Sequence, residues 1–107
     1  MTEHDLQNEI RIALNRYGMT LRLNVGNVKT ADGRYFNTGL PRGTSDLQFI
    51  GNNGTVAFIE VKLPGRKPSP EQKNFIQKIR SCGLFAGVAH SVDEAIKIIG
   101  GEKNYGI

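Results

Sequence analysis

The chain has 107 residues, which suffices for one hydrophobic core and leaves little room for a second, so we expect a single domain over residues 1–107. Hydrophobic residues form 38% of the sequence and charged residues 22%, a balance typical of folded globular proteins, which excludes disordered and collagen-like chains. The formal net charge of +4 favours a polyanionic partner, but basic charge alone is equally compatible with a protein that never binds nucleic acid.

Cysteine usage and hydropathy bear on the cellular compartment. Cys82 is the only cysteine in the sequence, so no disulfide forms within the chain and a reducing compartment is expected. We expect Cys82 to be a small buried residue of a helix. The N-terminal residues do not form a signal peptide, and no stretch is apolar and long enough to span a bilayer. These features predict a cytoplasmic protein with no membrane partner.

The first part of the chain predicts a helix followed by a strand. Apolar residues recur at helical spacing from about Asp5 to Tyr17, and Gly18 follows as a stop signal. Apolar and polar residues then alternate from Met19 to Val25, which is the period of a half-buried strand.

The middle of the chain predicts a turn and two strands. Asp32-Gly33 is a turn signal, consistent with a short hairpin or an excursion near the sheet. Irregular chain over residues 39–43 leads into a strand at Asp46–Ile50, and a Gly-Asn-Asn-Gly turn joins it to a strand at Thr55–Lys62. The second of these strands is apolar on both faces for most of its length, which favours a central position in a sheet covered on both sides.

The C-terminal part predicts a helix, a strand and a second helix. A Ser-Pro pair at residues 69–70 opens a helix that ends at Gly83, and residues 84–89 read as a continuous apolar strand. A second capping box at residues 91–94 starts a last helix, which ends at the glycine pair at residues 100–101.

The order of helix, three strands, helix, strand and helix predicts an α/β fold. The late strand, helix, strand passage implies a right-handed parallel crossover beside an antiparallel meander. We therefore expect a mixed sheet flanked by helices, with an αβββαβ core and one further helix at the C-terminal end.

A charged pair ends the predicted central strand. Glu60 and Lys62 lie two residues apart, so their side chains leave the same face of the strand, while Val61 points into the packing. A carboxylate and an ammonium at the end of a buried strand are costly to desolvate, which favours a ligand or an ion as their purpose. The alternative is a solvated strand end with an incidental ion pair, which is common and energetically minor.

Asp46 strengthens the first interpretation. It opens the neighbouring strand, and antiparallel pairing places the start of one strand beside the end of the other, so Asp46 and Glu60 are expected to converge. Two carboxylates suit Mg²⁺ or Mn²⁺, which keep several waters and bind substrate phosphate. Lys62 would orient or help to deprotonate the attacking water and offset the charge that builds on the phosphorus oxygens.

This arrangement resembles the PD-(D/E)XK nuclease superfamily, and more closely its VRR-NUC family, which includes short stand-alone proteins of phages and bacteria. The resemblance covers most of the chain from Gly39 to Ile99. The residues that carry it are Gly43-Thr44-Ser45-Asp46-Leu47, Phe58-Ile59-Glu60-Val61-Lys62, Gly65, Ser69-Pro70-Glu71-Gln72 and Gly83.

The resemblance implies roles for several residues. By the family pattern, Asp46 and Glu60 bind the metal together with the backbone carbonyl of Val61. Lys62 is then catalytic. Ser45 departs from the pattern, because the family usually has a proline before the aspartate; that proline shapes the chain and performs no chemistry.

The family pattern also adds residues from the two flanking helices. Gln72 would reach the site from its helix, and Glu9 is the best match to an acidic residue on the first helix that often takes part. Each has an ordinary alternative. Gln72 would close the capping box with Ser69, a role that does not exclude the first, and Glu9 would be a boundary charge of an amphipathic helix.

A basic loop follows the catalytic strand. Arg66 and Lys67 are well placed to hold a phosphate backbone near the metal, although a solvated basic loop is equally compatible with the sequence. His4 and His90 lack a Cys or His partner at ligand spacing, so we assign neither to zinc, and no nucleotide-binding motif is present.

Together with the resemblance, these features predict a Mg²⁺-dependent (or Mn²⁺-dependent) DNA endonuclease. Because stand-alone relatives in the family resemble Holliday-junction resolvases, the resemblance implies action on branched DNA in replication, recombination or repair. Two cuts by so small a chain require two subunits, so we expect a homodimer. The alternative is a catalytically silent DNA-binding or assembly module that retains the nuclease fold.

Overall fold

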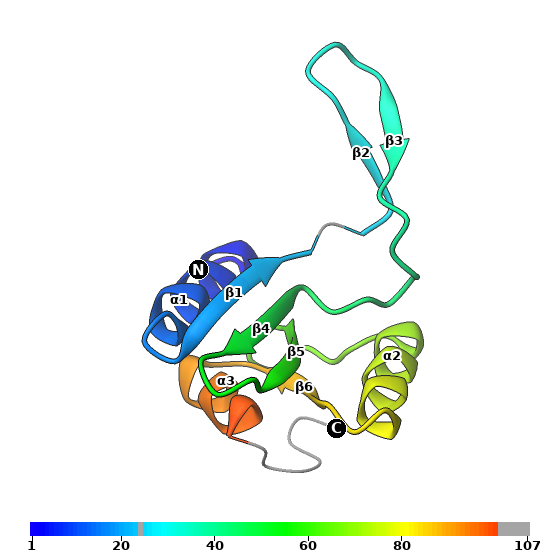
Figure 1. The fold of residues 1–107 in the computed structure, drawn as a ribbon. Helices are drawn as coiled ribbons and strands as arrows, with labels where there is room; N and C mark the ends of the chain where they lie inside the picture. Colours follow the sequence, from blue (N-terminus) through cyan, green and yellow to red (C-terminus); the bar gives the residue numbers. More distant parts are fainter. Residues whose placement is uncertain (24, 101–107) are drawn as a thin grey trace.

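The computed structural model describes residues 1–23 and 25–100, and this part of the chain folds into a sheet with helices on both sides (Figure 1). In chain order the elements are α1 (Glu3–Leu14), β1 (Gly18–Arg22), β2 (Asn27–Lys29), β3 (Tyr35–Asn37), β4 (Leu47–Gly51), β5 (Val56–Val61), α2 (Pro70–Ser81), β6 (Phe85–Ala89) and α3 (Val92–Ile99). The predicted α/β class with a mixed sheet is confirmed.

The main sheet has the strand order β1, β4, β5, β6. The pairs β1–β4 and β4–β5 are antiparallel, whereas β6 lies parallel to β5. Helix α2 connects the two parallel strands, as expected for a crossover unit. Because β4 and β5 run in opposite directions, the beginning of β4 and the end of β5 lie at the same edge of the sheet.

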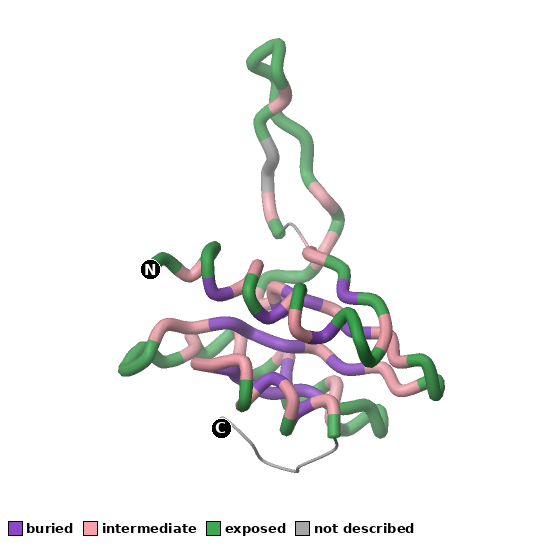
Figure 2. The backbone as a smooth tube through the Cα atoms, turned by 90° about the vertical axis from the view of Figure 1, so that its left-hand side faces the viewer, coloured by how far each residue is buried: buried purple, intermediate pink, exposed green. Residues whose placement is uncertain are grey.

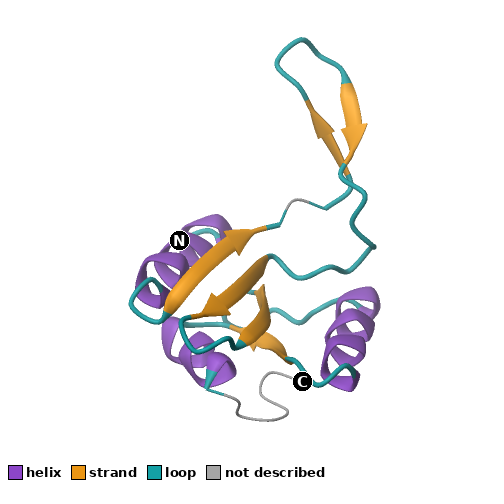
Figure 3. Cartoon of the chain, in the orientation of Figure 1, coloured by secondary structure: helices purple, strands orange, loops and turns teal. Residues whose placement is uncertain are grey.

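Helices cover the two faces of this sheet unequally (Figure 3). Helices α1 and α3 pack against one face, and α2 packs against the other face over β5 and β6. The core under α1 and α3 consists of Leu6, Ile10, Leu14, Leu47, Phe49, Ala57, Ile59, Val61, Ala89, Ala95 and Ile98. The smaller core under α2 consists of Ile76, Ala86 and Val88, with Phe58 and Ile79 packed against it.

Residues just before each of the first two helices determine where they begin. Thr2 forms a capping box with Asp5, so α1 starts two residues earlier than predicted; it ends at Leu14, short of Tyr17. Ser69 caps α2 and Pro70 occupies its first turn, which confirms the prediction. Within residues 1–23 and 25–100, no helix is long and apolar enough to cross a membrane.

Two local predictions are wrong in detail. At the start of α3 the Ser91 hydroxyl accepts the N–H of Glu94, but the Glu94 carboxylate reaches one residue further back and accepts the N–H of His90 at 2.7 Å. Cys82 is exposed, because it caps the C-terminal end of α2, where the chain leaves the helix. Gly100 caps α3, and Gly101 lies outside the described residues.

Strands β2 and β3 form a separate hairpin that projects away from the core (Figure 2). The predicted turn at Asp32-Gly33 joins them. The strand predicted from Met19 to Val25 is shorter in the structure: β1 ends at Arg22, where the chain turns out of the sheet toward this hairpin.

Candidate active site

Two carboxylates meet where β4 begins and β5 ends. Asp46 immediately precedes β4, and the antiparallel register, continued by one residue, sets it opposite Glu60. The Asp46 Oδ2 atom accepts the N–H of Val61 at 2.8 Å, and the Asp46 backbone carbonyl accepts the N–H of Leu23 at 2.8 Å. Asp46 is thus held against the end of β5 by its side chain and against the end of β1 by its backbone.

Glu60 is almost completely buried, with 1% of its surface exposed. Its neighbours Ile59 and Val61 belong to the core under α1 and α3, so alternation along the strand turns Glu60 toward α2. Its Oε2 atom accepts a hydrogen bond from Gln72 Nε2 at 3.2 Å, and its Oε1 atom is buried without a hydrogen-bond partner in the described part of the chain. A buried carboxylate oxygen that accepts no hydrogen bond indicates a place for a ligand or ion.

Its surroundings oppose the ionisation of Glu60. Burial raises the pKa of Glu60 to about 9, reinforced by a side-chain hydrogen bond that the protonated carboxyl makes with Asp46 and by the negative charge of Asp46, and the positive charge of Lys62 acts in the opposite direction. Two ionised carboxylates this close repel each other, so both ionise readily only when a cation lies between them. The electrostatics of the site therefore favour a positively charged ligand.

Gln72 combines the two roles that the sequence left open. Its Oε1 atom accepts the N–H of Ser69 at 2.8 Å, which closes the capping box of α2, and its Nε2 atom donates to Glu60. The amide is held by the cap, so it meets Glu60 in a fixed orientation. Helix α2 and strand β5 are joined at this point by a polar contact.

Lys62 follows the end of β5 and is half-buried. Its N–H donates to the carbonyl of Ala89 at 3.1 Å, which extends the parallel pairing with β6 by one residue. Continued alternation places Lys62 on the same face as Glu60, and its charge lowers the pKa of that carboxyl. The structure thus brings Asp46, Glu60, Lys62 and Gln72 together at one edge of the sheet.

An acidic residue of α1 that the sequence interpretation did not select acts electrostatically on Glu60. Glu9 is exposed on the helix surface, whereas the charge of Glu3 contributes to the raised pKa of Glu60. Glu3 lies three residues before the buried Leu6 and seven before the buried Ile10, on the core-facing stripe of α1. That spacing is the signal that would have identified it.

Comparison with known proteins identifies the family. A family model described as the VRR-NUC domain matches residues 1–93. The chain belongs to the VRR-NUC family. A solved structure described as a VRR_NUC domain is 25% identical in sequence, with a TM-score of 0.66 over 92% of this chain and 95% of that chain. Curated proteins give no significant match. Membership implies a nuclease-type, DNA-processing domain.

The donor groups of this VRR-NUC chain fit a hard divalent cation. Among residues 1–23 and 25–100, no group of three or more His, Cys, Asp or Glu side chains gathers around a common point. Two carboxylates, from Asp46 and Glu60, are instead the small protein ligand set that Mg²⁺ accepts, because that ion keeps waters and substrate phosphate in its remaining positions. The unpartnered Oε1 of Glu60 agrees with such a ligand.

The position that usually holds proline in VRR-NUC proteins is fully buried here. Ser45 has 0% of its surface exposed, and its hydroxyl has no hydrogen-bond partner among the described residues. The position therefore favours an apolar side chain, and serine fits it sterically without taking part in the chemistry.

The basic loop after β5 contacts the start of α3 through His90. Arg66 and Lys67 are exposed, and the Arg66 backbone carbonyl lies 2.9 Å from His90 Nε2. The other ring nitrogen of His90 lies 3.0 Å from the Glu94 carboxylate. The histidine thus links the loop to the first turn of α3.

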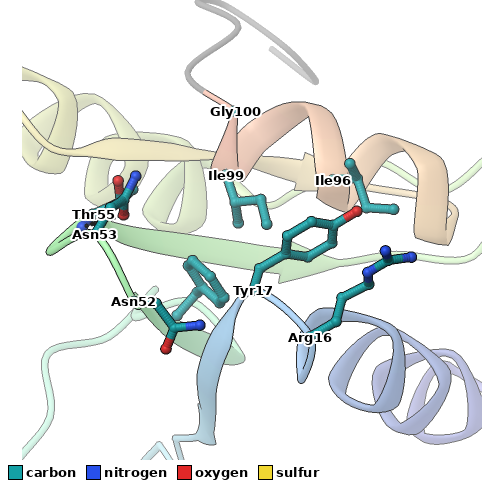
Figure 4. Close-up of a pocket in the computed structure, with 9 residues that line it drawn as sticks. Arg16, Tyr17, Asn52, Asn53, Thr55, Ile96, Ile99 and Gly100 are labelled. Atoms are coloured by element: carbon teal, nitrogen blue, oxygen red, sulfur yellow. Dashed lines mark hydrogen bonds between the residues drawn. The ribbon is translucent and has the colours of Figure 1, made fainter.

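A hollow of about 410 Å³ lies at the opposite end of the sheet (Figure 4). Tyr17, Phe49, Ile96 and Ile99 form its apolar wall, and Arg16 stacks on the Tyr17 ring at 5.3 Å from its centroid. It contains none of the candidate catalytic residues, because the turn between β4 and β5 that borders it is at the far end of both strands from Asp46 and Glu60.

Proposed function

We propose that this chain is a divalent-metal-dependent DNA endonuclease that hydrolyses phosphodiester bonds in branched DNA. One observation carries the proposal: a nearly fully buried Glu60 has one oxygen that accepts no hydrogen bond from the described residues, and it stands against a second carboxylate, Asp46, at the end of the central strand. Such a group is costly in a protein that only needs to fold. Its presence is explained if a cation and a phosphate complete the site.

The residues of the site have separate roles in the proposed reaction. Asp46 and Glu60 would hold Mg²⁺ or Mn²⁺, together with the backbone carbonyl of Val61. When bound, the ion would supply Lewis-acid polarisation of the phosphate and a more acidic water. Gln72 orients Glu60, because its own amide is fixed by the cap of α2.

Lys62 acts on the substrate side of the site. Its ammonium would stabilise the negative charge that develops on the phosphorus oxygens and help to orient the attacking water. As the new bond from the water oxygen to phosphorus forms, the bond from phosphorus to the leaving oxygen breaks, and the leaving oxygen takes up a proton. Glu3 lies close enough to affect Glu60 electrostatically, so we assign it a place at the border of the site.

Branched DNA and a homodimeric state are the finer parts of the proposal. A chain of this size carries one set of candidate catalytic residues, so paired cuts in the two strands of a junction need two copies. The basic charge of the chain and the exposed Arg66 and Lys67 beside the site support DNA as the substrate.

The decisive experiment measures single-turnover cleavage of labelled linear, flapped and four-way DNA with and without Mg²⁺. Glu60→Gln keeps the shape of the side chain but removes its charge, so cleavage should nearly vanish. Lys62→Ala should spare the carboxylates and reduce the rate by roughly 10²–10³, the effect of one electrostatic donor in a transition state.

Binding provides the control for this experiment. Both variants should remain folded and retard the four-way DNA in a gel with Ca²⁺, which occupies such sites without supporting turnover. If both variants cut at the wild-type rate, the assigned site is wrong. If the wild-type chain binds DNA but never cuts it, the chain is a binding module that retains the nuclease fold.

A further inference from the structure

The β2–β3 hairpin has no packing role in the core. We define the arm as residues 26–39, which comprise β2, its turn and β3. Its two strands pair only with each other in the described part of the chain, and every residue of β3 is exposed (Figure 2). An isolated two-stranded hairpin is only marginally stable in water, so its persistence as a projection calls for a partner.

Backbone hydrogen bonds close the arm at its tip and at its root. At its tip the Thr30 N–H donates to the Arg34 carbonyl at 2.7 Å, and Gly33 supplies the positive φ of 87° that the turn requires. At its root the Thr38 N–H donates to the Gly26 carbonyl at 2.9 Å. Gly26 and Gly39 both have positive φ values, of 89° and 80°, so a glycine marks each point where the arm joins the body.

Both roots of the arm lie at the candidate active site. The outgoing chain passes Leu23, whose N–H donates to the Asp46 carbonyl. The returning chain passes Gly43, which packs directly against the backbone of Glu71 in the first turn of α2, next to Gln72. The arm therefore rises from the edge of the sheet where the carboxylates converge (Figure 1).

The side chains of the arm have the chemistry of a nucleic-acid contact. Lys29 and Arg34 are exposed and basic, and Arg34 forms an exposed ion pair with the one acidic residue of the arm, Asp32, at 3.3 Å. Two aromatic side chains stand beside them: Tyr35 is 68% exposed and Phe36 is 52% exposed. The Lys29 Nζ atom lies 6.0 Å from the Tyr35 ring centroid, so a cation and an aromatic surface are presented together. Basic groups bind phosphates, and in the major groove an aromatic ring makes apolar contact with the thymine methyl group.

We propose that the arm is a second DNA-binding element, which lies in a groove of the duplex that flanks the scissile phosphate. The inference rests on the proposed nuclease function. A two-stranded β-ribbon fits the major groove of B-form DNA, which is about 12 Å wide, whereas the deep, narrow major groove of A-form RNA does not admit it. The arm would therefore favour duplex DNA over duplex RNA.

Two double variants test the proposal in the full-length protein. Lys29→Ala with Arg34→Ala removes two phosphate-binding charges, and Tyr35→Ser with Phe36→Ser removes the aromatic surface. Affinity is measured by fluorescence anisotropy in Ca²⁺ with three probes of one sequence: duplex DNA, single-stranded DNA and duplex RNA. Each variant should bind duplex DNA at least about tenfold more weakly, and the basic variant should lower the log-log salt slope by about 2.

Two matched variants control for charge and hydrophobicity. Arg16→Ala with Lys78→Ala makes the same change in net charge at exposed sites away from the arm. Ile12→Ser with Leu84→Ser removes two exposed apolar side chains elsewhere, of which Ile12 is 73% exposed. Both controls should bind duplex DNA within about threefold of the wild type.

The outcomes separate the arm from the nuclease proposal. If the arm variants bind duplex DNA as well as the controls while the wild type cleaves DNA, the arm proposal fails and the nuclease proposal stands. If the arm variants lose dimerisation in the ultracentrifuge and keep the wild-type DNA affinity per subunit, the arm binds a second copy instead. Equal losses for duplex RNA and duplex DNA would overturn the groove assignment. A wild-type chain that neither binds nor cuts DNA would overturn both proposals.

Discussion

The surroundings of Glu60 oppose the ionisation of its carboxyl, and this makes the stability of the fold depend on pH. Its pKa of about 9 in the folded, metal-free chain exceeds the ordinary value of 4.5, so between these values the folded chain holds a proton that the unfolded chain has released. The contribution of the Glu60 carboxyl to the free energy of unfolding is therefore fully present below pH 4.5 and is lost as the pH rises through about 9.

We expect the free energy of unfolding of EDTA-treated protein to fall with rising pH across this interval. The slope due to Glu60 is at most about 1.4 kcal/mol for each pH unit. Urea unfolding at several pH values measures it against Glu60→Gln, in which the slope should disappear. Glu9→Gln removes an exposed carboxylate and should keep the wild-type slope; a wild-type slope in Glu60→Gln would contradict the assignment.

Gly43 occupies a position that no other residue fits. A Cβ atom there would lie 2.2 Å from the Glu71 carbonyl oxygen and 2.9 Å from the Gln72 backbone nitrogen, and its φ is +84°. Gly43→Ala should therefore push the first turn of α2 away from β4, displace Gln72 from Glu60, and destabilise the fold by more than the roughly 1–3 kcal/mol of an unfavourable φ alone.

Gly54→Ala is a matched control for this prediction. Gly54 has nearly the same φ, +86°, but a Cβ atom there would meet nothing within 4 Å. The difference between the two denaturation midpoints isolates the steric clash at Gly43. Equal midpoints would show that the packing against α2 relaxes without cost.

At the scale of elements, the long periodic segments were predictable and the short ones were not. Strand β5 was predictable from its apolar run and from the turn that precedes it. Helix α2 was predictable from its hydrophobic period and from the Ser-Pro cap at its start. Strands β2 and β3 have three residues each, too few to show a hydrophobic period, so only their turn was visible in the sequence.

The candidate site was likewise predictable from the sequence only in part. Convergence of Asp46 and Glu60 follows from strand direction, which the turn between the two strands reveals. The contribution of Glu3 depends on how far α1 extends toward the N-terminus, and hence on the Thr2 cap. The predicted start at Asp5 is two residues too late and leaves Glu3 outside the helix.

The basic loop between β5 and α2 yields a prediction at this scale. Arg66→Ala with Lys67→Ala should weaken binding to all DNA sequences similarly, because phosphate contacts carry no sequence information. The log-log salt slope on duplex DNA should fall by about 0.9 for each phosphate that the variant no longer neutralises. A salt titration monitored by anisotropy measures both effects. Arg16→Ala with Lys78→Ala is the charge-matched control, and an unchanged slope would place the phosphate backbone elsewhere.

For the whole molecule, the prediction concerns assembly. We expect the purified protein to sediment as a homodimer at micromolar concentration, because one chain offers a single set of candidate catalytic groups and a junction requires two cuts. Analytical ultracentrifugation measures the state directly. A strict monomer that still nicks flaps would favour a flap or repair nuclease over a resolvase-like enzyme.

The parallel pairing of β5 with β6 also affects when activity first arises during synthesis. The Lys62 N–H is bonded to the carbonyl of Ala89, and α2, which supplies Gln72, is held in place by its packing against β6. A ribosome-bound chain that lacks residues 85–89 therefore has every candidate catalytic side chain but no scaffold to align them. We expect cutting to begin only when nearly the whole domain has emerged, which would spare the DNA of the cell from partly made enzyme.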